Sequence, residues 1–131
     1  AALQMRRGDK SAYADEIGLT VDAVLARARR LAADLPLVVA TDDRSNATLD
    51  KVRRAGFAVV QPDLLARLFP PRFALTSIAA YLVDILLCVK ARVFVGTATR
   101  RMKSKQLELI KALRRGRWRD LPGRPRDHVL T

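Results

Sequence analysis

Residues 3–10 read LQMRRGDK, a short apolar run followed by two arginines, a glycine, an aspartate and a lysine. The run predicts a strand over residues 2–5. If that strand belongs to a parallel α/β sheet, its carboxyl end lies where such sheets bind ligands. Arg6 and Arg7 point in opposite directions along an extended chain, so at most one faces that crevice. A guanidinium there offers paired donors for phosphate oxygens. We therefore expect a diphosphate site, with a surface charge cluster as the alternative.

The residues after the arginines suit a turn beside such a site. Gly8 lets the backbone turn sharply, and Asp9 can hold an arginine or accept a hydrogen bond from a ligand hydroxyl. Lys10 adds a further positive charge. Residues 11–19 are polar and show no clear periodicity, so no element is predicted for them.

Strands and helices alternate in the next stretch. Thr20 is a good N-cap for a helix whose apolar residues recur at helical spacing to Leu31, and Pro36 ends that segment. An apolar run at 37–40 predicts a buried strand, followed by Asp42 and Asp43. A second helix begins at residue 45 or 46 and closes at residue 56, before a strand at 57–60. This alternation predicts right-handed βαβ units and a parallel sheet.

The most apolar segment is FALTSIAAYLVDILLCVK, residues 73–90. A membrane span needs about 20 apolar residues, so this shorter run with Asp84 inside favours a helix buried against the sheet. A buried carboxylate requires a partner. Two interpretations of Asp84 stay open: a contact within the fold, or an acceptor kept for a ligand's donor groups.

A fourth strand is predicted at 93–95, before the sequence Gly96-Thr97-Ala98-Thr99. We expect a helix over residues 100–115, whose N-terminus would attract an anion. Arg100, Arg101 and Lys103 oppose the helix dipole there, which favours a bound anion; a solvated helix face is the alternative. The domain is predicted over residues 1–116. Residues 117–131 read as a basic, mobile tail, in which Trp118 packs back onto the domain.

Composition limits the classes of function. The net charge is +12, and 12 Lys or Arg against 3 acids follow residue 90, so an anionic partner is expected: a nucleotide, nucleic acid or membrane surface. One cysteine, Cys88, and one histidine, His128, provide no disulfide framework and no zinc or Ser-His-Asp pattern. No phosphate loop or dinucleotide fingerprint occurs. Aromatics make up 5%, which disfavours stacking on single-stranded nucleic acid.

Four separated pieces occur in the order LQMRRGDK, VVATDD, TSIAAYLVDILLCVKARVFVGT and TRRMKSKQLELIKALRRG. Together they resemble the donor-binding half of the GDP-fucose fucosyltransferase superfamily, which includes α1,6-fucosyltransferases and protein O-fucosyltransferase-like enzymes. The resemblance covers nearly the whole chain to residue 116. It implies a Rossmann-like parallel sheet of about four strands with flanking helices, the C-terminal half of a GT-B glycosyltransferase. It also implies an inverting, metal-independent reaction with GDP-fucose as donor.

The resemblance implies roles for individual residues. Arg6 looks like the arginine that binds the β-phosphate and stabilises the leaving GDP. Asp84 looks like the carboxylate that accepts hydrogen bonds from guanine N1 and N2. Asp15 and Glu16 are candidates for the general base. The remaining residues implied at the donor site are Gln4, Arg7, Asp9, Lys10, Asp42, Asp43, Thr97, Thr99 and Arg100.

Two positions depart from the family pattern. Gln4 stands where many relatives have a histidine two residues before the first arginine, and Arg100 replaces a second serine after Thr99. The N-terminal acceptor-binding half of such enzymes is absent from this sequence, so a fragment that is inactive alone is expected. A non-catalytic relative, or a basic module for nucleic acid or anionic surfaces, are the alternatives.

The expected partners follow from the resemblance. They are a nucleotide-sugar donor, a glycan or protein hydroxyl as acceptor, and the N-terminal half of the same enzyme; no metal is expected. Localisation would be the Golgi or ER lumen in a eukaryote and the cytoplasm in a bacterium.

Overall fold

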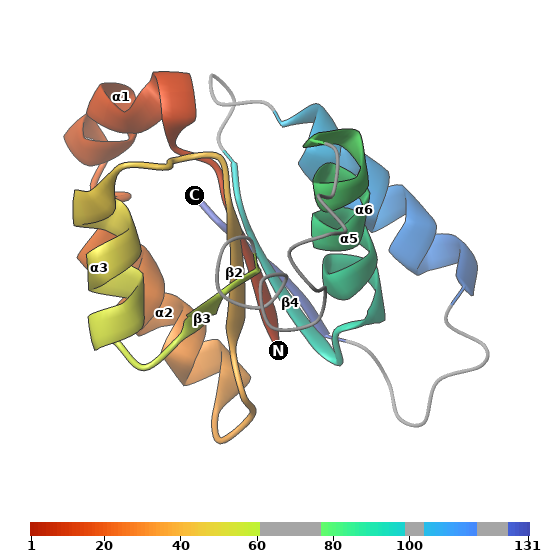
Figure 1. The fold of residues 1–131 in the computed structure, drawn as a ribbon. Coiled ribbons are helices and arrows are strands. Elements are labelled where there is room, and N and C mark those ends of the chain that lie inside the picture. The colour runs from red at the N-terminus through yellow and green to blue at the C-terminus, as the bar shows by residue number, and fades with distance from the viewer. Residues whose placement is uncertain (61–76, 99–103, 118–125) are drawn as a thin grey trace, which may run out of the picture.

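The computed structural model describes residues 1–60, 77–98, 104–117 and 126–131, which form a parallel sheet between two layers of helices (Figure 1). Within these described residues the sheet has five strands, in the order β3-β2-β1-β4-β5. All neighbouring strands pair in parallel. The strands are β1 Ala2–Met5, β2 Val38–Thr41, β3 Ala58–Val59, β4 Val93–Thr97 and β5 Arg126–Leu130. The fold is therefore α/β and compatible with a Rossmann-like topology, as the alternation of elements predicts.

The helices divide between the two faces of the sheet. One face carries α1 Ser11–Glu16, α2 Val21–Ala32 and α3 Asn46–Arg54, and the other carries α5 Ser77–Lys90 and α6 Lys105–Arg117 (Figure 1). A short 3-10 helix, η1 Gly8–Lys10, precedes α1. The strand order runs outward from β1 to β3 and then resumes on the other side of β1 with β4. The topological switch point, where open α/β sheets bind ligands, is thus between β1 and β4.

Local sequence explains the helix boundaries. Thr20 Oγ1 accepts a hydrogen bond from Ala23 N–H at 3.3 Å and caps α2. Ser45 Oγ accepts one from Thr48 N–H at 3.4 Å and caps α3. Gly56 follows α3 with φ +78°, the left-handed conformation that glycine adopts without steric cost. The predicted starts of these two helices are confirmed.

The sheet has a packed core on each face. Leu3 and Met5 of β1 pack with the α1–α3 layer. On the other face, Ala2 of the same strand and Phe94 of β4 belong to a second core with residues of α5 and α6, among them Ile110. Strand residues alternate between faces, and all four residues of β1 are buried because helices cover both. Coverage of both faces explains why the exposed polar residues of a half-buried strand are absent from β1 and why even its one polar residue, Gln4, is buried.

The C-terminal segment departs from the prediction. Residues 126–130 form β5, which pairs with β4 from Val93↔Arg126 to Thr97↔Leu130. This part of the expected tail is therefore the fifth strand of the sheet, and the prediction of about four strands is one too few. Trp118 lies outside the described residues. The parallel pairing of the whole five-residue strand is the physical reason why residues 126–130 belong to the domain.

Two further boundaries differ. Residues 11–16 form α1 rather than an irregular segment. Helix α6 begins at Lys105 and not at residue 100, because Ser104 Oγ accepts a hydrogen bond from Leu107 N–H at 3.2 Å and caps it there. Within the described residues, the apolar segment before β4 is helical over Ser77–Lys90. Among the helices that are described, we find none with the length and apolar character needed to cross a bilayer.

Candidate functional site

The loop that follows β1 lies at the switch point of the sheet. The backbone N–H of Arg6 donates to Thr97 Oγ1 at the end of β4, at 2.9 Å. The Thr97 hydroxyl in turn donates to the carbonyl of Gln4, at 3.5 Å. Thr97 is buried, with a relative exposure of 1%. The Thr97 side chain therefore links β4 to the chain just beyond the last paired residues of β1 and positions the backbone of Arg6.

Asp42, after β2, holds the same loop from the other side. Its Oδ1 accepts hydrogen bonds from the backbone N–H of Arg7 at 2.6 Å and of Gly8 at 3.0 Å. A Cβ on Gly8 would lie 2.8 Å from Asp42 Oδ2, so any larger residue here would displace the Asp42 carboxylate. Arg6 Nη1 lies 3.8 Å from Asp42 Oδ2. Asp42 thus orders the backbone on which the two arginines are carried.

The two arginines have different environments, as their alternation predicts. The Arg7 side chain is buried, donating to Leu19 O at 2.8 Å and to both carboxylate oxygens of Asp15 at 2.9 and 3.0 Å. It connects the β1 loop to α1 and to the start of α2. The Arg6 side chain is 30% exposed. Of the two guanidiniums, that of Arg6 is therefore the one accessible to a ligand.

Asp43 is an internal acceptor. Its Oδ2 accepts a hydrogen bond from Thr48 Oγ1 at 2.6 Å, and its Oδ1 accepts one from Ser45 N–H at 2.9 Å. Burial raises the pKa of this carboxyl, but the hydrogen bonds from Thr48 and Ser45 and the charge of Arg7 outweigh burial and hold the pKa below its ordinary value. Asp43 stays ionised and fixes the turn between β2 and α3.

Gln4 occupies the face of β1 opposite to Leu3 and Met5. It is 3% exposed, and its Nε2 donates to Gln106 Oε1 in the first turn of α6, at 3.4 Å. Its own Oε1 is buried and has no hydrogen-bond partner among the described residues. The Gln4 side chain therefore extends from β1 to the beginning of α6, close in sequence to the Arg6 loop.

Asp84 lies on the inner face of α5. Ala80, Asp84 and Cys88 follow one line along the helix, and all three are buried. Burial raises the pKa of the Cys88 thiol to about 12; the nearby Asp84 carboxylate adds to this rise and Arg114 opposes it. Ala2 and Gln4 of β1 face the same helix layer. Asp84 and the even-numbered residues of β1 are thus on one side of the sheet.

The other residues predicted at the donor site are exposed, known only by their backbone, or outside the described residues. Lys10 and Glu16 are exposed, at the beginning and end of α1. The backbone of Asp9 belongs to η1. Thr99 and Arg100 lie outside the described residues. Among the residues that are described, no group of three or more His, Cys, Asp or Glu side chains could hold a metal ion.

Three participants in this frame were not predicted from the sequence. They are the carbonyl of Leu19, the side chain of Gln106 and the Ser104 cap of α6. Only Ser104 carries a local signal, since serine is a preferred N-cap residue. The chain matches no family model, no curated protein and no solved structure.

Proposed function

We propose that this domain binds the diphosphate of a nucleotide-sugar donor, GDP-fucose, at the carboxyl edge between β1 and β4. It would serve as the donor half of a fucosyltransferase-like, inverting and metal-independent glycosyltransferase of the GT-B type. The observation that carries the proposal is the position of Arg6 at the topological switch point, with its backbone held by Thr97.

The chemistry of donor cleavage gives Arg6 its role. Breaking the sugar–phosphate bond develops negative charge on the departing diphosphate, and a preorganised guanidinium stabilises that charge without reorganisation during the reaction. The frame built by Thr97 and Asp42 supports such preorganisation. Arg7 would contribute indirectly, because Asp15 and Leu19 already engage its guanidinium. In this proposal Arg6 contacts the phosphate and Arg7 positions the loop.

Asp84 would recognise the guanine base. A carboxylate accepts two parallel hydrogen bonds from guanine N1 and N2, which distinguishes guanine from adenine and uracil. The location of Asp84 on the side of the sheet that Ala2 and Gln4 face supports this role. The base would have to reach a side chain that is 6% exposed, so nucleotide binding is expected to open α5 locally.

Transfer requires a general base and an acceptor, and the two candidate bases differ. Both Asp15 oxygens accept hydrogen bonds from Arg7, so Asp15 acts in the frame of the loop. Glu16 is exposed and remains the candidate base. The acceptor, a glycan or protein hydroxyl, would be bound by an N-terminal half of the enzyme.

Calorimetric titration with GDP, UDP and ADP tests the proposal. We expect GDP to bind most tightly and Arg6→Gln to weaken it by about tenfold or more, since a charge-assisted contact is lost. Arg115→Gln, at an exposed position of α6, removes the same charge and serves as a control that should leave binding unchanged. Asp84→Asn should reduce the preference for GDP over UDP. Absence of nucleotide binding by the folded domain, or equal binding by the Arg6 and Arg115 variants, would refute the proposal.

A second candidate is a nucleotide-binding relative without transferase activity. The engagement of Asp15 by Arg7 favours it, because it leaves Glu16 alone of the two predicted acids as a candidate base. Donor hydrolysis separates the two: the transferase half, joined to its acceptor domain, releases GDP from GDP-fucose, whereas the relative binds the donor and leaves it intact. Binding of arbitrary DNA with a steep salt dependence, and no nucleotide preference, would replace both with a basic binding module.

A further inference from the structure

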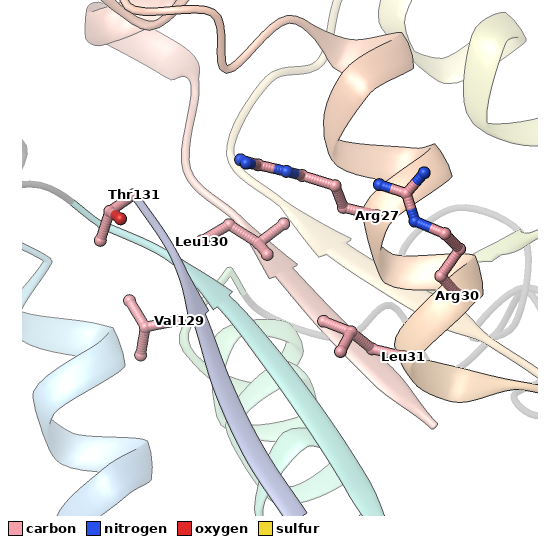
Figure 2. Close-up of a pocket in the computed structure, with 6 residues that line it drawn as sticks. All are labelled: Arg27, Arg30, Leu31, Val129, Leu130 and Thr131. Atoms are coloured by element: carbon pink, nitrogen blue, oxygen red, sulfur yellow. The ribbon is translucent and has the colours of Figure 1, made fainter.

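A second surface with features of a binding site lies at β5, two strands from β1 in the sheet order. A pocket of about 290 Å³ opens between α2 and the end of β5. Figure 2 shows Arg27 reaching from α2 toward this strand, with Arg30 on the next turn of the helix. The residues that line the pocket are Arg27, Arg30, Leu31, Val129, Leu130 and Thr131. Two cations therefore stand above a largely apolar floor.

No described residue neutralises the two arginines of this pocket. Both are exposed, and neither has an ion-pair or hydrogen-bond partner in the described part of the chain. The contrast is with Arg7 and Arg114, whose guanidiniums are buried and bonded. Guanidiniums pair well with carboxylates, which they bind through two parallel hydrogen bonds. The charge of the pocket thus favours an anionic ligand.

The edge of the sheet lies beside these arginines. Strand β5 is the last in the sheet order, so it pairs with β4 on one side only among the described strands. Arg126 N–H donates to Arg92 O, and Leu130 O accepts from Ala98 N–H, so these residues direct their backbone groups toward β4. Backbone groups alternate along a strand, so those of Asp127 and Val129 point to the open edge. They present donors and acceptors to an added strand.

We propose that this edge binds an extended acidic peptide segment of a partner protein, which pairs with the outward backbone groups of β5 and places its carboxylates on Arg27 and Arg30. The spacing fits: side chains two residues apart on a strand are separated by about 6.6 Å, and residues three apart on a helix by about 5–6 Å. The intervening side chains of the peptide point to the opposite face of the sheet, where Val129 is 40% exposed. The ligand is therefore a segment in which acidic and apolar residues alternate.

The test is fluorescence polarisation with a labelled peptide of alternating glutamate and valine, and with the same peptide carrying glutamine for glutamate. We expect only the acidic peptide to bind. The double variant Arg27→Gln/Arg30→Gln should weaken binding by about tenfold or more, because two charge-assisted contacts are lost. Arg54→Gln/Arg115→Gln, which removes the same charge from exposed sites on α3 and α6, should leave it unchanged. Equal weakening by both pairs would overturn the proposal, since it would indicate attraction by net charge alone.

Strand pairing is tested separately. Two peptides are methylated on alternate backbone nitrogens, one on the odd-numbered and one on the even-numbered residues. In one of them the methyl groups replace the N–H donors that face β5, and in the other those donors are kept. We expect one of the two methylated peptides to lose binding and its counterpart to retain it, without any change to the protein. Val129→Pro should also abolish binding, because proline removes the outward N–H and is tolerated on an edge strand. Binding that survives both methylation patterns would overturn the proposed pairing.

Discussion

Replacing Arg114 with methionine is the sharpest test of how α5, α6 and β5 are held together. The Arg114 side chain is fully buried, and its Nη1 donates to three carbonyls at the end of α5: Cys88 at 2.8 Å, Val89 at 3.0 Å and Ala91 at 2.8 Å. Its Nε donates to Asp127 Oδ1 of β5 at 2.7 Å. Arg114→Met keeps most of the side-chain volume and removes every one of these bonds.

The expected cost follows from what the substitution leaves behind. Breaking a buried ion pair by removing one partner costs about 3–5 kcal/mol. The Asp127 side chain is 39% exposed and can return to water, which reduces the penalty. The carbonyls of Cys88 and Val89 are buried, and each loses a charged donor. We therefore expect a loss of about 3 kcal/mol, a large part of the roughly 5–15 kcal/mol that stabilises a domain.

Urea unfolding at neutral pH measures the loss, and hydrogen exchange locates it. The amides of β5 and of the end of α5 should exchange faster in Arg114→Met than in the original protein. Lys111→Met is the matched control: Lys111 is on the same helix and its Nζ lies 3.4 Å from Glu108 Oε1 in an exposed pair, so removing it should cost less than about 0.5 kcal/mol. A loss below about 1 kcal/mol in Arg114→Met would refute the inference that Arg114 joins the three elements.

Three further outcomes are expected. Gly8→Ala should destabilise the protein by about 1–3 kcal/mol in urea unfolding, because the new Cβ displaces the Asp42 carboxylate; an unchanged midpoint would contradict this. Asp43→Asn should be less stable at neutral pH. The difference in unfolding free energy between the two proteins should shrink as the pH falls below 3.8, the ordinary pKa of aspartate, because a lowered pKa contributes stability only while the carboxyl is ionised. A difference that does not change with pH would refute this prediction. Cys88, with a pKa of about 12, should resist Ellman's reagent at pH 8 until urea unfolds the chain.

The parts of the fold that were predictable are those in which local pattern and tertiary environment agree. The strand at residues 2–5 is apolar except for Gln4, because both of its faces are covered, and its bounds agree with β1. The cap signals at Thr20 and Ser45 are local, so they act in the same way before and after folding. The predicted divergence of Arg6 and Arg7 also rests on local geometry, the alternation of side chains along an extended chain.

The parts that were missed depend on partners distant in sequence. Strand β5 reads RDHVL, and only its last residue, Leu130, is buried, so an apolar run is lacking. Asp127 pairs with Phe94 of β4 and is also held by Arg114 from α6. Helix α1 buries only Ala14, and the pair between Asp15 and Arg7 adds a polar attachment to the β1 loop. When a segment is rich in polar residues whose partners are distant in sequence, its own sequence predicts a loop.

The acids of the candidate site illustrate the same limit for function. Asp42 and Asp43 were predicted at the donor site, and they do lie at the carboxyl end of β2, beside the Arg6 loop. Their oxygens, however, accept hydrogen bonds from Arg7, Gly8, Ser45 and Thr48. The amides of Arg7 and Gly8 are consequently not available to a phosphate while Asp42 holds them. A diphosphate at this edge would depend on side-chain cations, which is why substitution of Arg6, rather than of either acid, is the decisive test of the donor site.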